Sequence, residues 1–385
     1  MAAKHLEVPE DIFFMLNPNY SNSEANSNLA SLSQYVSINL TKLDHNIEAI
    51  RSCLAANTQL WPVIKDDAYG HGAIPLAKHL SSLVHGFCVV RSSEGVRLRE
   101  AGIRKPILVF EPPDERSISL FSSHQLIASV SHSRHLDLLE TGCSYHVNID
   151  TGMKRLGASV EELPRLLEVI KKRTDLRGEG VYTHFFQADD PYSPTVAQQL
   201  DQFQQLQSYF PTEWLRHTAN SGAIFHYSKH LSLLYDAVRP GICLYGYSAG
   251  KQAIDLLLPI LSWQSQLVHY QPIKIGESVS YGARWRAPSD GWVGVIPVGY
   301  VHGLSRLLSN QMKVRIQDAL YEQVGSITMD FTLIWLGKNQ LPVNTPVYLL
   351  DAQRLRANIW ALKTNTIAYE ITTRISPIVP RVYVF

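Results

Sequence analysis

The sequence predicts an α/β protein: a (β/α)8 barrel over residues 35–250, followed by a mainly β domain over residues 255–385. Two observations carry this prediction. Between residues 60 and 250, short apolar runs alternate with stretches of helical periodicity, which indicates parallel strands joined by helices. After residue 255, short apolar runs are separated by Gly, Pro and Asn turns, which is typical of an antiparallel sheet.

Eight apolar runs predict the barrel strands, and eight strands are the number that closes such a barrel. The predicted strands are residues 60–64, 87–90, 107–110, 126–130, 145–149, 180–183, 214–216 and 234–238. The predicted helices between them are residues 73–84, 92–101, 133–139, 160–172 and 196–209. An open, doubly wound sheet is the structural alternative, because short strands are easily miscounted.

The β domain is predicted from a second set of apolar runs. Its predicted strands are residues 262–270, 292–298, 313–317, 331–336 and 346–350, with one helix at 352–362. Residues 35–40 also have the pattern of a strand, which belongs either to the barrel or to the β domain. Residues 18–34 are small and polar, and residues 1–34 as a whole are predicted to be a flexible N-terminal extension without an export signal.

Composition excludes several classes of protein. Thirty-five basic against 34 acidic residues give a net charge of +1, so there is no basic excess for binding nucleic acid. No run approaches the roughly 20 apolar residues that a membrane span needs. The four cysteines are scattered and the two histidines of an HxxH pair lack carboxylate neighbours, so no metal site is expected. A cytoplasmic enzyme of small molecules fits these limits.

Chemistry in such barrels gathers at the carboxyl ends of the strands. Five cationic or titratable residues follow predicted strands there: Lys65, Arg155, His184, His217 and Arg239. A lysine that ends an apolar strand either points to solvent or serves as a neutral amine or imine, because a buried ammonium is costly. Gly241 and the turn at residues 220–222 offer the close backbone and hydroxyl that hold a phosphate. The combination points to pyridoxal 5'-phosphate.

Several segments, in order along the chain, resemble those of the alanine racemases, pyridoxal-phosphate enzymes built from a barrel and a β domain. The matching segments are 65–72 (KDDAYGHG), 149–157 (IDTGMKRLG), 183–185 (THF), 217–221 (HTANS), 238–246 (VRPGICLYG), 279–282 (VSYG), 299–300 (GY) with Arg306, and 329–330 (MD). The likeness extends from about residue 36 to the C-terminus and leaves residues 1–34 outside.

The resemblance implies roles for individual residues. Lys65 would hold the cofactor and exchange the substrate Cα proton on one face, and Tyr281 would do so on the other. Arg155, Met329 and Tyr300 would bind the substrate. The implied cofactor-binding residues are Lys65, Tyr69, His184, Asn220, Ser221, Arg239, Gly241 and Ile242. The implied supporting residues are His217, Asn148 and Asp330. The amino-acid substrate would be bound in a homodimer with shared active sites.

The chain also departs from the family pattern. Many members carry a carbamylated lysine at the position of Asn148, and a bound anion such as chloride would support Arg155 here instead. Asp66 and Asp67 replace the usual Ala-Asn, residues 301–302 (VH) replace Ala-Asp, and Pro377 replaces a tyrosine. The predicted function is alanine racemisation, which supplies D-alanine for cell-wall synthesis. A broader racemase acting also on serine is the first alternative. A non-catalytic pyridoxal-phosphate carrier is less favoured, since those proteins generally lack the β domain.

Overall fold

The computed structural model describes residues 32–227, 235–250 and 254–385 and divides them into two compact units. The barrel unit is Asp44–Leu257, and the β unit combines the described residues up to Leu43 with Leu258–Phe385. Most of the predicted N-terminal extension, residues 1–31, lies outside the described residues. The first strand begins directly after it, at Gln34.

The barrel unit contains an eight-stranded parallel sheet in the order β2-β9-β8-β7-β6-β5-β4-β3. Its strands are β2 (Gln59–Leu60), β3 (Phe87–Val89), β4 (Ile107–Val109), β5 (Ile127–Val130), β6 (Ser144–Asn148), β7 (Arg177–Tyr182), β8 (Leu215–His217) and β9 (Ala237–Val238). The two edges meet through a parallel bridge between Val63 and Cys88, where the Cys88 amide donates to the Pro62 carbonyl over 2.8 Å. The predicted (β/α)8 barrel is therefore confirmed.

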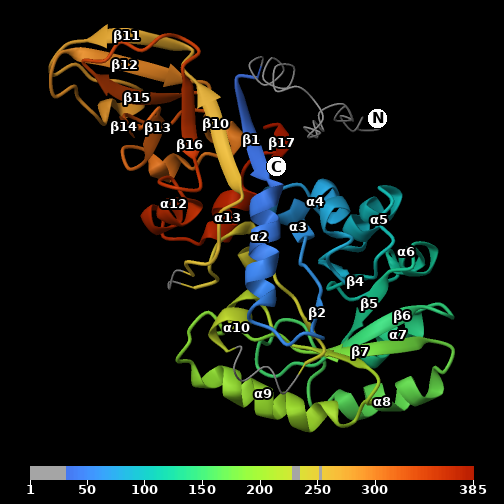
Figure 1. Ribbon diagram of the computed structural model, residues 1–385. Helices are drawn as coiled ribbons and strands as arrows, with labels where there is room; N and C mark the ends of the chain where they lie inside the picture. Colours follow the sequence, from blue (N-terminus) through green and yellow to red (C-terminus); the bar gives the residue numbers. More distant parts are fainter. Residues whose placement is uncertain (1–31, 228–234, 251–253) are drawn as a thin grey trace. The chain divides into compact units, whose positions relative to one another are not determined.

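Helices separate these strands in sequence, as the alternating pattern predicted (Figure 1). They are α2 (Leu40–Arg51), α3 (Lys65–Gly70), α4 (Ala73–Leu80), α5 (Ser92–Glu100), α6 (Ile118–Ser123), α7 (Ser133–Leu138), α8 (Leu163–Lys172), α9 (Pro194–Gln207) and α10 (Ser221–His226). Strands β3, β4 and β5 are buried along their whole length, because the helices cover them outside and side chains fill the barrel inside. No helix in the described ranges is long and apolar enough to cross a bilayer.

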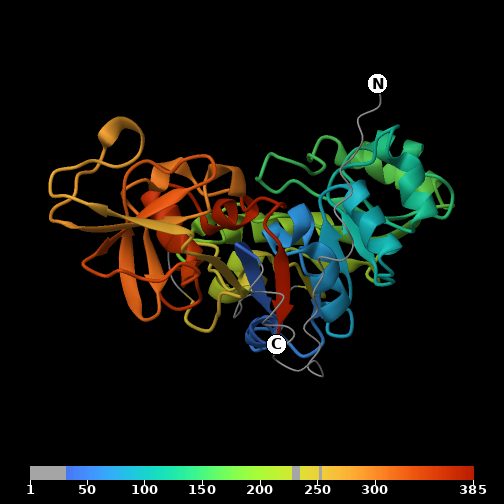
Figure 2. The same cartoon turned by 90° about the horizontal axis from the view of Figure 1, so that it is seen from above.

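The β unit is a nine-stranded sheet in the order β11-β12-β15-β14-β13-β16-β10-β1-β17. Its strands are β1 (Gln34–Asn39), β10 (Leu261–Gln266), β11 (His269–Ile273), β12 (Gly291–Ile296), β13 (Lys313–Ile316), β14 (Ala319–Gln323), β15 (Thr332–Gly337), β16 (Pro346–Leu350) and β17 (Arg381–Val384). Strand β1 pairs antiparallel with β10 and parallel with β17, so the start and the end of the described chain lie side by side (Figure 2). The strand predicted at residues 35–40 thus belongs to this sheet.

The structure differs from the prediction at several strands of the β unit. The single strand predicted at residues 262–270 is two strands, since β10 pairs with β16 and β11 pairs with β12. At the break, the Leu267 amide donates to Thr345 and the Val268 amide to Val295, so the partner changes within two residues. The apolar pattern continues across this bend and conceals it. Strands β14 and β17 and the helices α12 (Ala357–Lys363) and α13 (Ala368–Thr373) complete the unit.

One hydrophobic cluster fills the part of the β unit beside the segment that carries Tyr281. It consists of Ile273, Val279, Ala287, Val293 and Val324, with Trp285, Leu333 and Trp335 packed against it. Val279 lies two residues before Tyr281 in the sequence. The packing of this cluster therefore fixes the backbone from which the Tyr281 side chain projects.

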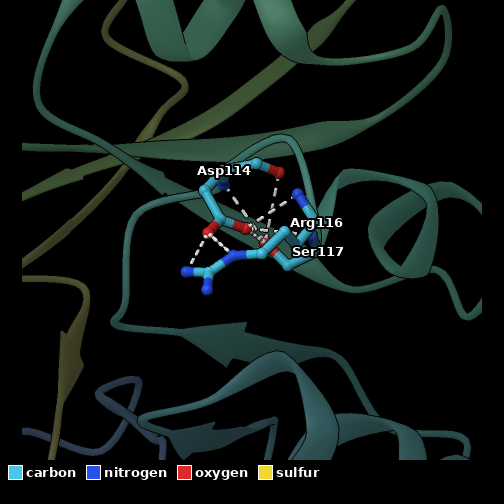
Figure 3. A network of polar contacts seen from close by, with 3 residues as sticks. All are labelled: Asp114, Arg116 and Ser117. Carbon is cyan, nitrogen blue, oxygen red and sulfur yellow. Dashed lines mark hydrogen bonds and ion pairs between the residues drawn. The ribbon is translucent and has the colours of Figure 1, made fainter.

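A compact polar network orders the loop that follows β4 (Figure 3). The Asp114 carboxylate accepts hydrogen bonds from the Ser117 hydroxyl over 2.7 Å and from the Arg116 guanidinium over 2.8 Å. These bonds favour the charged carboxylate and lower the pKa of Asp114 to about 2. The network lies in an exposed turn just before α6 and contains none of the predicted site residues.

Candidate active site

The predicted barrel residues lie at the carboxyl ends of parallel strands, which meet at one rim of the barrel. Asn148 is the last residue of β6 and His217 is the last residue of β8. His184 follows β7 by two residues, and Arg239 directly follows β9. Lys65 follows the bridge that closes the barrel. The fold therefore brings these residues to one end of the unit.

Arg239 is a fully buried arginine whose hydrogen bonds set the protonation of its neighbours. Its Nη1 donates to His217 Nδ1 over 2.7 Å, and its Nη2 donates to the carbonyls of Thr183 over 2.7 Å and Thr218 over 3.2 Å. Because a guanidinium only donates, His217 Nδ1 must be the acceptor, and its proton is on Nε2. That Nε2 lies 2.9 Å from Nδ1 of His146, which accepts in turn. Both imidazoles are neutral in this arrangement.

Burial and charge agree with the neutral histidines. Desolvation, followed by the nearby Arg239 cation, lowers the pKa of His146 to about 3 and lowers that of His217 well below its ordinary value. The same two causes lower the pKa of His184 to about 3. Arg239 is thus the cation in a buried network whose histidines are neutral. Its orientation is fixed by acceptors on His217, Thr183 and Thr218.

These histidines predict acid sensitivity of the fold. In an unfolded chain a histidine titrates near ~6.5, whereas folded His146 stays neutral down to about pH 3. Protons therefore bind the unfolded state preferentially. The contribution of neutral His146 to the free energy of unfolding is fully present above pH ~6.5 and is lost as the pH falls toward 3. We expect His146→Asn to reduce this loss by up to about 1.4 kcal/mol per pH unit, measured by urea unfolding between pH 7 and pH 5. An unchanged slope would contradict neutral burial of His146.

Ser221, Gly241 and Tyr69 form a narrow cradle at the same rim. The Ser221 hydroxyl oxygen accepts the amides of Gly241 over 2.9 Å and Cys243 over 3.4 Å, which leaves its hydrogen to donate to another acceptor. A Cβ at position 241 would lie 2.8 Å from Tyr69 Oη and 3.7 Å from Ser221 Oγ. Only glycine therefore lets the backbone approach these two hydroxyls. Buried Ile242 begins the short 3₁₀ helix η2 (Ile242–Tyr245) next to them.

Asn220 has a structural role in this cradle. Its Oδ1 accepts the Ala223 amide over 3.1 Å, and its Nδ2 donates to the Phe185 carbonyl over 3.0 Å. These bonds cap α10 and tie its start to the segment after β7. The asparagine thus fixes the position of Ser221, its neighbour in sequence.

The residues of this rim fit pyridoxal 5'-phosphate. Arg239 Nε is buried and has no hydrogen-bond partner among the described residues, whereas both Nη atoms of Arg239 are bonded. A buried donor without a partner is costly and is expected to meet an acceptor such as a ring nitrogen. The Ser221, Gly241 and Tyr69 cradle supplies the hydroxyls and close backbone that hold a phosphate. Lys65 supplies an amine at the same rim.

Lys65 stands at the start of an unusual backbone. Residues 66–69 have φ of 51–55° and ψ of 36–51°, so α3 is a left-handed turn made of four consecutive non-glycine residues. Such a conformation costs about 1–2 kcal/mol per residue, so the surroundings must impose it. The turn leaves Lys65 Nζ 6.0 Å from the Tyr69 ring and 3.8 Å from Asp66 Oδ2, with the lysine side chain 33% exposed. The sequence pattern did not predict this turn.

Asn148 and Arg155 bracket the loop that follows β6. Asn148 is buried, and its Oδ1 accepts no hydrogen bond within the described residues. The loop is shaped by Asp150, whose Oδ1 accepts the amides of Gly152 and Lys154 over 2.8 and 3.1 Å. Arg155 is exposed. The prediction that an anion links Asn148 to Arg155 stays a prediction.

The remaining predicted residues lie in the β unit. Tyr281, Tyr300 and Met329 are exposed by 74%, 44% and 52%. The segment at residues 326–329 connects them, because Ser326 Oγ donates to the Tyr281 carbonyl over 2.8 Å and the Tyr300 amide donates to Thr328 over 3.0 Å. Asp330 is exposed beside Met329. The barrel residues and these residues thus belong to different units.

Two contributors to the site were not predicted. His146 extends the Arg239 network, and its signal was a histidine inside the apolar run 145–149. Glu94 binds the turn after Lys65 through an amide hydrogen bond of 2.5 Å. Its signal was a glutamate three residues after Arg91, the residue that precedes the predicted helix, which is the spacing of a capping box.

Comparison with known families gives two matches that together cover most of the chain. Residues 38–249 match the family model described as alanine racemase, N-terminal domain, and residues 260–383 match alanine racemase, C-terminal domain. The boundary between the matches, residues 250–259, includes the boundary between the barrel and β units at Leu257.

Individual proteins give the same result. The chain is 32% identical to the alanine racemase of Carboxydothermus hydrogenoformans over 91% of this chain and 99% of that protein. It is 33% identical to the enzyme of Treponema pallidum, over 90% and 98%. Among solved structures, the alanine racemase of Clostridium difficile matches with a TM-score of 0.85 and 28% identity, over 92% and 96% of the two chains. A histidine racemase from Leuconostoc mesenteroides, at 24% identity and a TM-score of 0.85, shows the fold alone.

The fold, a parallel barrel followed by a separate β unit, and the relatives that match over most of the chain assign the protein to the amino-acid racemases, a class of isomerase. The length and identity of the matches narrow this further. The chain belongs to the alanine racemase family.

Proposed function

We propose that this protein racemises alanine with pyridoxal 5'-phosphate bound at the barrel rim. One observation carries the proposal: the partnerless Arg239 Nε, the Ser221–Gly241 cradle and Lys65 lie at the same rim. The three features match the ring nitrogen, the phosphate and the aldehyde of that cofactor. The alanine racemases among the relatives support the substrate.

The two bases divide the reaction between two faces of the substrate. When bound, the cofactor withdraws electrons from the substrate Cα and so makes its proton removable. Lys65 Nζ takes or returns the proton on one face, and the Tyr281 hydroxyl does so on the other. A phenol is a weak acid, so a tyrosine that serves as a base needs a cation close by to favour its phenolate, and Arg155 is the residue assigned to this role.

Arg239 determines what happens to the negative charge that follows proton removal. A guanidinium holds its protons firmly, so Arg239 donates a hydrogen bond without transferring a proton. Its acceptors His217, Thr183 and Thr218 keep it in place. The charge consequently stays close to the substrate Cα and favours a quick return of the proton, which is the requirement of a racemase.

We include a homodimer in the proposal. Tyr281, Tyr300 and Met329 are exposed on the β unit, although an acid–base tyrosine and a substrate-binding amide need an environment without bulk water. A second copy of the chain would cover these side chains and bring them to its own Lys65. The supply of D-alanine for cell-wall synthesis and a cytoplasmic location complete the proposal and rest on the family alone.

The proposal is tested by assaying the purified holoenzyme against a panel of L-amino acids. We expect L-alanine to be racemised fastest, and borohydride reduction to attach the cofactor to the peptide that contains Lys65. Attachment to another lysine would refute the assigned site. Cofactor binding without racemisation of any amino acid would favour the alternative of a non-catalytic carrier.

A broader racemase is the second candidate, and Pro377 is the observation that favours it. Pro377 is exposed in the β unit, and the amide of its neighbour Ser376 donates to the His302 carbonyl over 3.0 Å. His302 ends the short helix η4 (Tyr300–His302), so Pro377 lies close to the proposed substrate-binding Tyr300. A proline in place of the tyrosine of other family members removes a ring and a hydroxyl from this neighbourhood.

We expect Pro377→Tyr to lower the activity on serine relative to alanine. A pocket discriminates one extra small group by about 10- to 200-fold. The ratio of kcat/KM for serine to that for alanine should therefore decrease by a factor in this range. The measurement is steady-state racemisation of both amino acids by holoenzyme with equal cofactor content. An unchanged ratio would mean that position 377 does not determine specificity.

A further inference from the structure

Glu94 is a carboxylate that binds two parts of the barrel rim at once. It lies in the first turn of α5, where its Oε2 accepts the amides of Val90 and Arg91, each over 2.9 Å. Its Oε1 accepts the amide of Asp66 over 2.5 Å. Three backbone donors therefore converge on one side chain.

The bonds of Oε2 have an ordinary explanation and the bond of Oε1 does not. A glutamate three residues after the N-cap satisfies the N-cap amide in many helices, which accounts for Arg91. The amide of Asp66 is 28 residues away in sequence and is not part of α5. It belongs to the peptide bond between Lys65 and Asp66, where the left-handed turn begins.

The two ends of the left-handed turn are held in different ways. On its C-terminal side the turn is held by a local bond, in which Asp67 Oδ1 accepts the amide of Ala73, the first residue of α4, over 2.8 Å. On its N-terminal side, Glu94 connects the turn to Val90, which follows β3, and to Arg91 at the start of α5. Without this bond the strained backbone after Lys65 has less to hold it against its more favourable right-handed or extended forms.

We propose that Glu94 is a positioning residue that fixes the backbone of Lys65 and thereby aims the lysine amine. The proposal rests on the proposed role of Lys65 and deepens it. An amine displaced by about 1 Å from the productive geometry costs on the order of 100-fold in rate, so a small relaxation of the turn is sufficient to matter. The carboxylate acts through the peptide of Lys65 and touches neither substrate nor cofactor.

Glu94→Gln is the variant that separates the functions of the two oxygens. An amide side chain has one acceptor oxygen and an NH2 group that repels the backbone N–H donors. It therefore serves either α5 or the left-handed turn, but not both. Glu94→Asp is a second variant that we expect to fold, since a carboxylate in a first helical turn is stabilising, while one methylene less leaves the Asp66 amide out of reach.

Glu162 offers a matched control within the same barrel unit. Its Oε1 accepts the amide of Ser133, the first residue of α7, over 2.8 Å. Glu162→Gln thus disturbs a carboxylate–amide bond at the start of a different helix and should cost similar stability. Ser133 follows β5 and Glu162 follows β6, whereas Lys65 follows β2. The variant should therefore leave the left-handed turn unchanged.

The first measurement is hydrogen–deuterium exchange of the holoenzymes in the peptide that covers residues 65–72. The visible circular dichroism of the bound cofactor and the kcat and KM for alanine are measured on the same proteins. For Glu94→Gln and Glu94→Asp we expect exchange of this peptide to accelerate at least tenfold, the dichroism to change, and kcat to fall 10- to 100-fold with a smaller change in KM. Glu162→Gln should match the wild type in all four.

The outcomes separate this proposal from the proposed function. Unchanged exchange of residues 65–72 in both Glu94 variants would overturn the positioning role, whatever the activity. Equal acceleration in Glu162→Gln would also overturn it, because the effect would then be general loosening. If borohydride instead attached the cofactor to another lysine, the proposed site would fail, whereas accelerated exchange would still establish that Glu94 holds the turn.

Discussion

Lys65→Ala is expected to lower racemisation of alanine in both directions by about 10⁴-fold or more. The variant loses the amine that holds the cofactor and the base on one face of the substrate, and each is a separate contribution to the rate. Borohydride should then leave no cofactor attached to the peptide that contains position 65. The measurement combines racemisation rates with peptide mapping of the reduced protein.

Lys154→Ala is the control for this prediction. Lys154 is another lysine after a barrel strand, but its side chain is 77% exposed and pairs with Asp150 at 3.4 Å. We expect nearly wild-type racemisation and full attachment of the cofactor in this variant. Residual activity of Lys65→Ala above about 1% of the wild-type value would mean that another group serves as the first base.

Tyr281→Phe is expected to lower racemisation by about 10²- to 10⁴-fold while the cofactor stays attached to Lys65. The variant keeps the ring and removes only the hydroxyl that exchanges the proton. The Tyr281 side chain is exposed and its hydroxyl has no hydrogen-bond partner among the described residues, so stability should change little. Tyr270→Phe, at another tyrosine of the β unit, is the control and should keep full activity.

Mixing the two inactive variants tests whether the site is shared between subunits. A dimer of one Lys65→Ala chain and one Tyr281→Phe chain has one complete site if Tyr281 serves the partner, and none if it serves its own chain. Random exchange should restore roughly a quarter of the wild-type activity, since half of the dimers are mixed and each has one of two sites intact. No recovery after proven subunit exchange would assign each site to a single chain.

The sequence was informative about the barrel because periodicity reports burial. Each of the eight predicted runs overlaps an observed strand, from β2 to β9, and the titratable residues at the strand ends meet at one rim as parallel topology requires. The β unit was less predictable. Strand β17 pairs with β1 across nearly the whole chain, and no local pattern contains that information.

The geometry around the site was the least predictable part. The left-handed turn at residues 66–69 runs against the preference of four non-glycine residues, so propensity predicts the opposite conformation. The bonds that impose it come from Glu94 and Ala73, through contacts that only the folded chain brings together. The neutral state of His146 depends equally on burial beside Arg239. Local sequence reports none of these surroundings.

The position of β1 in the nine-stranded sheet has a consequence for how the protein is made. Tyr35 in β1 and Gln264 in β10, whose side chains share a hydrogen bond of 2.9 Å, are separated by 229 residues. A ribosome that adds ~5–20 residues per second needs about 10–50 s to synthesise that interval. During this time all of the barrel unit is synthesised, whereas β1 has neither of its partner strands. The sheet that carries Tyr281 is therefore completed only after β17 is translated, whereas every strand of the barrel that carries Lys65 is synthesised earlier.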